Sequence, residues 1–330
     1  MSPVLSVVMA TYNGERYIRE AIQSVLDQSF ADFEFIIVDD GSVDETAAII
    51  ASFDDARIVY IKKATNTGIA DSLNLGISTS KGIYIARMDD DDICMPDRFE
   101  AQLKVFEHHQ DVILCATDVL QNDPSTGVQA QVSHDELVMA LLFYNPIIHP
   151  TVMLKRGVLG QDPYDPSKVP SEDYELWSRL IWEGRFYKLN RPLLDYRSHA
   201  NSETSRRRKE QLKLNVAIAE YMFDRIGFRA YHDPGANLKR LVVHDYTISG
   251  RDLKHLMRWC VTLKRVNQTH NKFDITTFNA VVDKQIRLFL ISYFMNQKIK
   301  SKMIPFFSLS LSHKAVIVKH YLGKVIKRIG

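Results

Sequence analysis

The chain has 330 residues, of which 45% are hydrophobic and 25% are charged, and its formal net charge is +2 at pH 7. This composition excludes disordered, collagen-like and coiled-coil proteins and suits one large soluble domain or two ordinary ones. Three widely spaced cysteines, Cys94, Cys115 and Cys260, match neither a disulfide framework nor a zinc site, which favours a reducing compartment. The first residues lack a secretory signal pattern, and the longest apolar run, residues 288–295, is too short to span a bilayer. We therefore expect a cytoplasmic protein.

The small net charge hides two regions of opposite sign. Residues 205–330 contain 25 Lys+Arg and 8 Asp+Glu, a balance of +17, whereas residues 1–204 have a balance of −15. Such an asymmetry predicts two regions with different partners, because an acidic region can gather cations and a basic one can lie against an anionic surface. We expect one domain over residues 1–204 and a second, helical region over residues 205–330.

Strand and helix patterns alternate along the first 120 residues. Buried-strand patterns cover residues 5–10, 34–39, 58–61, 83–88 and 112–116. Helical spacing or capping signals cover residues 17–28, 70–77 and 97–108, with a further helix starting near Asp44. This alternation predicts right-handed βαβ units in a mostly parallel α/β sheet flanked by helices.

Polar residues follow three of the predicted strands. They lie at residues 10–14, 39–42 and 87–92, and in parallel sheets ligands bind beyond the carboxyl ends of the strands. The ring of Tyr12 can stack on a nucleobase, and the carboxylate of Asp40 can accept a base N–H or a ribose hydroxyl. The alternative for residues 39–42 is a simple turn with a helix cap, since Asp, Gly and Ser are turn residues.

Residues 89–92 are four consecutive aspartates at a strand end. Like charges this close are unfavourable unless a cation or cationic side chains offset them, and carboxylate oxygens suit Mg²⁺ or Mn²⁺. The pattern therefore indicates a metal site. The alternative is a solvated acidic loop in which Asp92 or Asp97 caps the next helix.

Residues 4–106 resemble the nucleotide-binding half of a family 2 glycosyltransferase of the GT-A fold. The resemblance is carried by residues 6–13, 21–28, 38–42, 66–68 with Asn74, and 86–92 followed by residues 96–98. It continues less densely through residues 149–153, 171–177 and 196–199, and it leaves residues 205–330 unexplained.

The resemblance implies an enzyme that transfers a sugar, with inversion, from a nucleotide-sugar donor (a UDP-sugar is expected) to a hydroxyl group of a glycan or lipid-linked acceptor. The implied nucleotide-sugar residues are Thr11, Tyr12, Asn13, Asp40, Asn66, Gly68, Asn74, Arg87, Asp89 and Asp90. Within the DxD element, which fits residues 89–91 or 90–92, Asp91 would bind the metal in either register. His199 is a second metal candidate, although a lone histidine is as often structural.

Such a transfer needs a metal on the departing diphosphate and a base for the acceptor hydroxyl. The resemblance places that base at Asp173, with Glu172 beside it and Arg197 as an acceptor-side or supporting residue. A plain alternative is that residues 171–173 only start a helix, where acids are favoured. The two interpretations are compatible, because the start of a helix can also present a base.

Residues 312–330 carry apolar side chains on one helical face and basic side chains on the other. This pattern predicts peripheral association with an anionic membrane surface, the alternative being a helix docked on the catalytic domain. Zinc-finger, RNA-recognition and helix-turn-helix patterns are absent, so we expect no nucleic-acid partner.

Other functions are weighed against the transferase hypothesis. The dinucleotide-binding pattern Gly-x-Gly-x-x-Gly and the P-loop pattern are absent after the first strand. A nucleotidyltransferase, or a non-catalytic glycan- or membrane-binding protein with a degenerate transferase domain, remains an alternative. The preferred hypothesis is an enzyme of surface polysaccharide or lipid-linked glycan synthesis at the cytoplasmic face of the inner membrane. The sequence indicates neither the sugar nor the linkage nor the oligomeric state.

Overall fold

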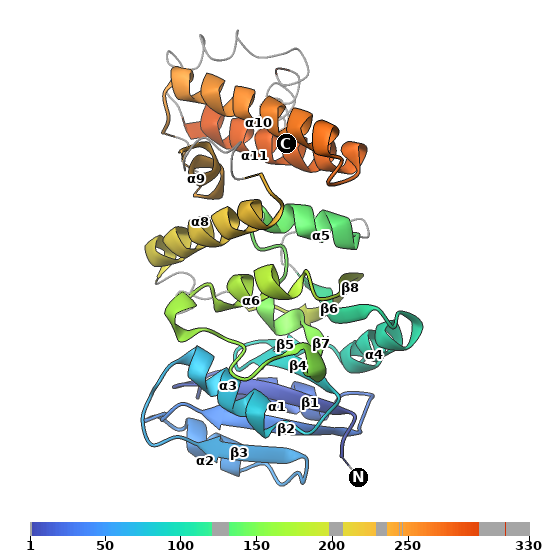
Figure 1. The fold of residues 1–330 in the computed structure, drawn as a ribbon. Helices are drawn as coiled ribbons and strands as arrows, with labels where there is room; N and C mark the ends of the chain where they lie inside the picture. Colours follow the sequence, from blue (N-terminus) through green and yellow to red (C-terminus); the bar gives the residue numbers. More distant parts are fainter. Residues whose placement is uncertain are drawn as a thin grey trace, which may run out of the picture. The chain divides into compact units, whose positions relative to one another are not determined.

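The computed structural model describes residues 2–120, 132–197, 207–228, 236–243, 245, 247–296 and 314 (Figure 1). The chain divides into two compact units. The first unit comprises residues 1–137 and 145–211, and the second comprises residues 138–144 and 212–330. The separate roles predicted for residues 1–204 and 205–330 stay a prediction.

The first unit contains a sheet of eight strands in the order β3-β2-β1-β4-β7-β6-β8-β5. The strands are β1 (Leu5–Thr11), β2 (Phe33–Asp39), β3 (Ile58–Lys62), β4 (Tyr84–Asp89), β5 (Ile93–Cys94), β6 (Val112–Leu120), β7 (Met153–Lys155) and β8 (Arg185–Asp195). Strands β1 to β4 are mutually parallel, β6 and β8 are also parallel, and β7 and β5 pair antiparallel with their neighbours. The sheet is therefore mostly parallel, as predicted.

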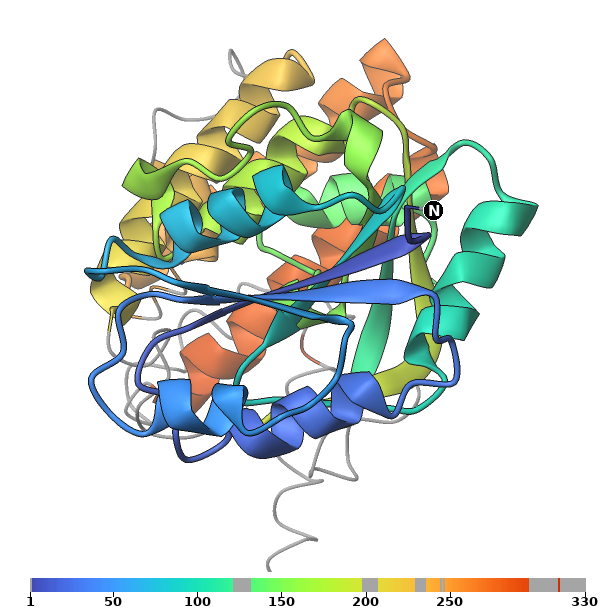
Figure 2. The same ribbon diagram turned by 90° about the horizontal axis from the view of Figure 1, so that it is seen from below.

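Helices cover both faces of this sheet (Figure 2). The helices of the first unit are α1 (Ile18–Leu26), α2 (Thr46–Ala51), α3 (Ile69–Thr79), α4 (Arg98–His108), the start of α5 (His134–Leu141), α6 (Glu172–Leu180) and the 3₁₀ turns η1 (His149–Thr151), η2 (Arg156–Val158) and η3 (Pro166–Lys168). Figure 2 shows α1 and α2 on one face of the strands and α3 on the other.

The two faces follow from the alternation of side chains along each strand. Leu5, Val7 and Met9 of β1 point into one core, which also contains residues of α1 and α4. Val8 points to the opposite face, where α3 packs so closely that a Cβ atom on Gly76 would lie 2.6 Å from Val8 Cγ1. Strands buried on both faces read as continuous apolar runs, which is why the sequence pattern located them.

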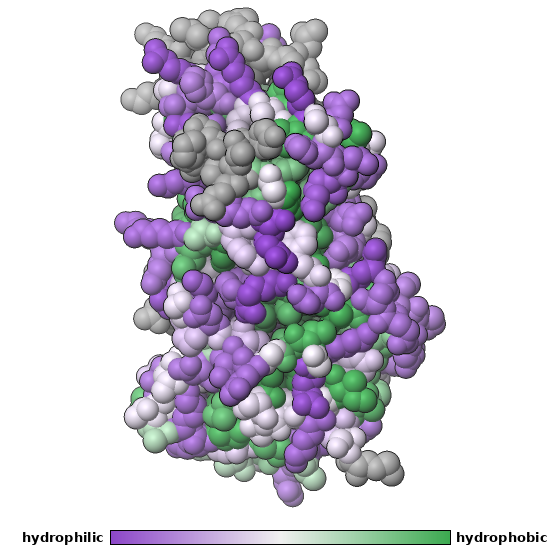
Figure 3. All heavy atoms as spheres, viewed as in Figure 1, coloured by the Kyte–Doolittle hydropathy of each residue, from purple (hydrophilic) through white to green (hydrophobic). Residues whose placement is uncertain are grey.

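The second unit is helical in its described part, as expected. Its helices are α8 (Arg208–Arg225, which begins in the first unit), α9 (Ala236–Val242), α10 (Gly250–His270) and α11 (Ile275–Asn296). The rings of Phe223 and Trp259 stack at 6.0 Å, and Lys264 of α10 pairs with Asp283 of α11 at 2.6 Å. Over α10 the face drawn in Figure 3 is mainly hydrophilic.

Two predictions concern membranes, and the described residues bear on the first of them. Among the residues described, no helix combines the length and the apolar content that crossing a bilayer requires. The basic amphipathic helix predicted for residues 312–330 lies outside the described residues, apart from Lys314.

Candidate active site

The carboxyl ends of β1, β2 and β4 meet at one edge of the sheet. Thr11 is in register with Asp39, and Ala10 is in register with both Val38 and Asp89. The chain runs from β1 outward to β3 and then returns to place β4 on the other side of β1, so the strand order reverses here. Such a reversal opens a crevice at the strand ends, where open α/β sheets bind ligands. The three predicted polar segments therefore share one site.

Asn13 and Gly14 shape the loop after β1. Asn13 has a φ of 53°, its main-chain N–H donates to Ser42 Oγ (2.9 Å), and its Oδ1 accepts the Val43 N–H (3.0 Å). A Cβ atom on Gly14 would lie 2.5 Å from Asp90 Oδ2, so a larger residue there would force the Asp90 side chain to shift. Asn13 thus ties two loops together, while the ring of Tyr12, 48% exposed, remains accessible for stacking.

Asp40 is held inside its loop. Its carboxylate accepts the main-chain N–H groups of Thr67 (3.0 Å) and Gly68 (2.8 Å) and pairs with Lys63 Nζ at 2.5 Å. Asn66, in the same β3–α3 loop, is exposed. Sequence reasoning missed Lys63, whose position just after β3 was the available signal. A base-binding role for Asp40 stays a prediction. In that role a base N–H would donate to a lone pair of the carboxylate that these three contacts do not use.

Three of the four consecutive aspartates form a cluster. Asp89, Asp91 and Asp92 each bring a carboxylate oxygen within 4.8 Å of the others, whereas Asp90 turns away and accepts a 2.5 Å hydrogen bond from Thr11 Oγ1. Asp92 is fully buried; its Oδ1 accepts the Arg197 N–H (2.9 Å), and its Oδ2 has no hydrogen-bond partner among the residues that the structure describes. The sequence analysis groups Asp89 with Asp90 on the nucleotide-sugar side, whereas the structure groups Asp89 with Asp91 and Asp92. The metal role of Asp91 stays a prediction.

The cluster is electrostatically suited to a cation. Burial, followed by the negative charge of Asp89, raises the pKa of Asp92 to about 8. Burial also raises the pKa of Asp90 to about 7, against the hydrogen bond from Thr11. A hard divalent ion prefers such oxygen ligands, and a buried carboxylate oxygen without a donor leaves one coordination position free. Asp97 takes the N-cap position of α4, but its side chain makes no capping hydrogen bond. Asp92 Oδ1 instead accepts the Arg197 N–H, so the alternative in which Asp92 or Asp97 caps this helix is not supported.

Two arginines hold the aspartate segment. Arg87, 5% exposed, forms an ion pair with Asp89. Burial by itself lowers the pKa of Arg87, but the charge of Asp89 and the hydrogen bond to it, with the charges of Tyr164 and Asp92, together raise that pKa. Arg197 donates from its Nε to the Asp91 carbonyl oxygen and from its Nη1 to Glu20 (2.5 Å), and its guanidinium lies 4.8 Å from the centre of the Tyr17 ring. Arg197 therefore supports the backbone of the cluster. His199 lies outside the described residues.

Asp173 stands in the first turn of α6. Ser171 takes the N-cap position without a side-chain cap bond, and Glu172 is buried. The Asp173 carboxylate accepts the Tyr174 N–H at Oδ1 (2.6 Å) and Asn145 Nδ2 at Oδ2 (2.8 Å). Burial raises the pKa of Asp173 to about 6, and the charge of Arg87 limits the rise. Sequence reasoning missed Asn145, which lies in a loop without periodicity.

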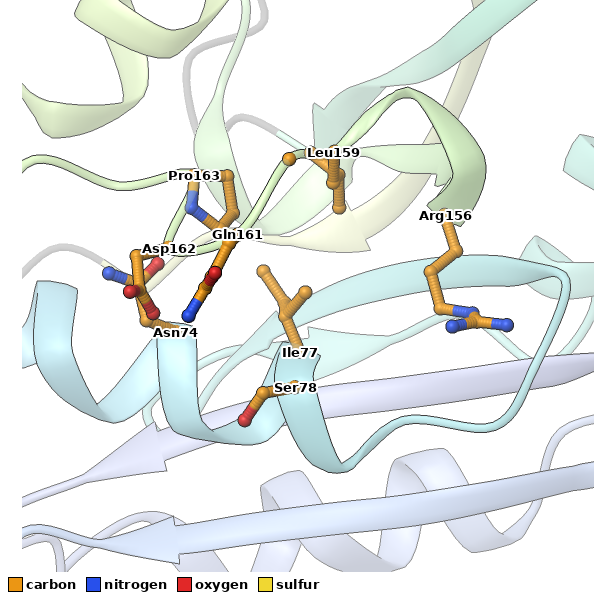
Figure 4. A pocket seen from close by; sticks show the side chains of 9 residues that line it. Asn74, Ile77, Ser78, Arg156, Leu159, Gln161, Asp162 and Pro163 are labelled. Atoms are coloured by element: carbon orange, nitrogen blue, oxygen red, sulfur yellow. The ribbon is translucent and has the colours of Figure 1, made fainter.

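Asn74 has a structural task in the first unit. Its amide exchanges two hydrogen bonds with the main chain of Tyr164 (2.8 and 2.9 Å), and it lines a pocket of about 160 Å³. In Figure 4 Asn74 and Asp162 lie at one side of this pocket and Arg156 at the other. Arg156 follows β7 beside the first residue of β4, and Asp89 is the last residue of β4. The side of the pocket lined by Arg156 is therefore at the opposite end of β4 from the aspartate cluster. A role for Asn74 near the nucleotide stays a prediction.

Comparison with known proteins agrees with this geometry. A family model for glycosyl transferase family 2 matches residues 6–159. The Escherichia coli protein WfaP, named UDP-Glc:alpha-D-GlcNAc-diphosphoundecaprenol beta-1,3-glucosyltransferase, is 32% identical over 235 residues, which cover 69% of this chain and 89% of that protein. The chain belongs to glycosyl transferase family 2.

The similarity of this glycosyltransferase to other proteins extends beyond the residues at the carboxyl ends of β1, β2 and β4. An uncharacterized glycosyltransferase of Haemophilus influenzae is 27% identical over 322 residues, which cover 92% of this chain and 97% of that protein. The mannosyltransferase PcManGT of Pyrobaculum calidifontis, solved with GDP-Man and Mn²⁺, has a TM-score of 0.56 at 16% identity and covers 90% of this chain and 89% of its own. The likeness shows a shared fold and confirms the predicted GT-A fold class. The family model and the similarity to WfaP confirm the predicted enzyme class, a glycosyltransferase.

Proposed function

We propose that this enzyme is a metal-dependent inverting glycosyltransferase that moves a sugar from a nucleotide-sugar to an acceptor hydroxyl. The observation that carries the proposal is the cluster of Asp89, Asp91 and Asp92 at the carboxyl end of β4, in which a buried Asp92 oxygen accepts no hydrogen bond from any described residue. A further carboxylate, Asp173, lies in the first turn of α6 and is not a member of this cluster. One site for a metal and diphosphate and a separate base are the two requirements of the reaction.

The names of similar proteins support the choice of substrates. WfaP is named for a UDP-Glc donor and a diphosphoundecaprenol-linked acceptor, and PcManGT was solved with GDP-Man. A UDP-sugar donor and a glycan or lipid-linked acceptor are therefore the substrates we propose, in surface polysaccharide synthesis. A lipid-linked acceptor would bring the enzyme to the cytoplasmic face of a membrane as a peripheral protein.

The metal would be Mn²⁺ or Mg²⁺, held by carboxylates of the cluster with Asp91 as a ligand. When bound, a divalent ion stabilises the negative charge that grows on the departing diphosphate. Asp90 and Thr11 would lie beside the ribose and diphosphate, and Tyr12 would stack on the base. Arg87 keeps the Asp89 carboxylate in place through its ion pair.

Asp173 would act as the general base. As the acceptor oxygen bonds to the anomeric carbon, its proton passes to the Asp173 carboxylate. The bond between that carbon and the diphosphate oxygen breaks, and its electron pair leaves with the nucleoside diphosphate. Attack from the face opposite the leaving group inverts the anomeric centre. A carboxylate with a pKa of about 6 is ionised at neutral pH and is still basic enough to take the proton.

Calorimetric titration tests the donor site directly. UDP, GDP and dTDP are each titrated with and without Mn²⁺ into the wild type, Asp91→Asn and the control Asp32→Asn, whose side chain is exposed on the surface. We expect one nucleotide to bind in a Mn²⁺-dependent manner to the wild type and to the control, and about 10–100-fold more weakly to Asp91→Asn. Absence of binding by all three nucleotides, or equal metal dependence in Asp91→Asn, would contradict the proposal.

A further inference from the structure

The carboxylate of Asp173 is fixed by a residue from a distant loop. Asn145 lies between α5 and η1, 28 residues before Asp173, and donates from Nδ2 to Asp173 Oδ2 at 2.8 Å. The other oxygen, Oδ1, accepts the Tyr174 main-chain N–H at 2.6 Å. One neutral donor on each oxygen defines the orientation of the carboxylate plane.

The amide of Asn145 is itself locked. Its Oδ1 accepts the main-chain N–H of Ile147 at 3.1 Å, which closes an Asx turn over Pro146. Because the oxygen is occupied by an N–H donor, the NH₂ group is the end that faces Asp173. A residue that precedes proline also has a restricted backbone, so little conformational freedom is lost in presenting this donor.

We propose that Asn145 is the positioning residue for the base of this glycosyltransferase, holding the Asp173 carboxylate ionised and in a fixed orientation. The inference rests on the role of Asp173 proposed above. A hydrogen bond donated to a carboxylate stabilises its ionised form over the protonated acid. A neutral amide does so more weakly than a cation would, which leaves the carboxylate able to accept a proton.

Other groups around Asp173 do not duplicate this contact. Among the described residues, the charge of Arg87 on β4 acts on Asp173, and the charges of Asp173 and of its neighbour Glu172 both act on Tyr164 in the loop before η3. Burial raises the pKa of Asp173, while the hydrogen bond from the Tyr174 N–H, the Arg87 charge and the Asn145 hydrogen bond, in that order, oppose the rise. Arg87 is ion-paired with Asp89, so its charge is shared with the strand-end cluster.

The substitution Asn145→Asp separates positioning from a purely structural role. An aspartate keeps the size and the oxygen that closes the turn with Ile147, but it replaces the donor by a second carboxylate. Since two carboxylates that share a site retain a proton, we expect the acidic limb of the pH profile of kcat/KM to move up by about one pH unit or more. At pH 7 kcat/KM should fall by about twofold or more, because a pKa moved from about 6 to about 7 leaves half of the carboxylate protonated there. It should recover at pH 9, with UDP affinity within about twofold of the wild type.

The control is Asn190→Asp, the same change on β8, which should leave the limb in place. A wild-type limb and rate in Asn145→Asp would overturn the inference. If Asn145→Asp lowers the melting temperature too far for assay, Asn145→Ser replaces it, because a hydroxyl keeps a turn acceptor but is too short to reach Asp173; an unmoved limb there overturns the inference equally. Asp173→Asn is assayed alongside. Full turnover of Asp173→Asn would contradict the proposed base itself. If Asp173→Asn is inactive but Asn145→Asp behaves like the wild type, only the positioning role of Asn145 is contradicted.

Discussion

The two carboxylate sites of the first unit differ in how their negative charge is balanced. Asp89, Asp91 and Asp92 crowd together at the end of β4, and burial and mutual repulsion raise the pKa of Asp92 to about 8. Asp173 is a single carboxylate with a neutral donor on each oxygen, and its pKa is raised to about 6. A crowded cluster is stable when a cation joins it, whereas an isolated carboxylate with neutral donors can exchange a proton. This difference supports the proposed metal role for the cluster and the proposed base role for Asp173.

The largest effect is expected from removing the proton acceptor. Asp173→Asn keeps the shape of the side chain but lacks a carboxylate, so kcat should fall by about 10²–10⁴-fold. Nucleotide affinity in the presence of Mn²⁺ should stay within about twofold, since the cluster is untouched. Steady-state kinetics and calorimetry on the same preparation measure both quantities.

The matched control for this variant is Asp135→Asn, an exposed aspartate in the first turn of α5. It should leave both kcat and nucleotide affinity unchanged. If Asp173→Asn weakens nucleotide binding as strongly as it lowers kcat, the two carboxylate sites are not chemically separate, and the comparison above is wrong.

Sequence patterns located one of these sites better than the other. The strand ends could be predicted because apolar runs mark buried strands and parallel strands bring their carboxyl ends together. The turn at Asp90 and Asp91 could not, because it breaks the alternation of the strand and so decides which carboxylates face one another. The contact between Asn145 and Asp173 joins residues 28 apart through a loop, and no local pattern encodes such a pairing.

The next effect is the pH dependence of turnover. Asp173 must be ionised to accept a proton, so with donor and Mn²⁺ saturating, kcat/KM for the acceptor should be flat above pH 7 and fall about tenfold per pH unit below a pKa of about 6. The sign follows from burial, which raises the pKa of this carboxyl and moves the loss of activity to higher pH than an exposed aspartate would give. A rate that stays constant down to pH 4.5 would show that Asp173 does not carry the proton.

The smallest effect is expected at the loop that holds the strand-end site together. In Gly14→Ala the added methyl group would lie 2.5 Å from Asp90 Oδ2 and 2.7 Å from Thr11 Oγ1, so the hydrogen bond between those side chains must break or shift. We expect the free energy of unfolding to fall by about 1–3 kcal/mol and nucleotide affinity to fall severalfold, as measured by thermal denaturation and calorimetry. Gly157→Ala, where a Cβ meets no atom within 4 Å, is the control and should change neither.

Because Asp173 and Asn145 take no part in this loop, the acidic limb of the pH profile should keep its position in Gly14→Ala. If the acidic limb shifts in Gly14→Ala while nucleotide affinity falls, the aspartate cluster and Asp173 are energetically coupled rather than independent.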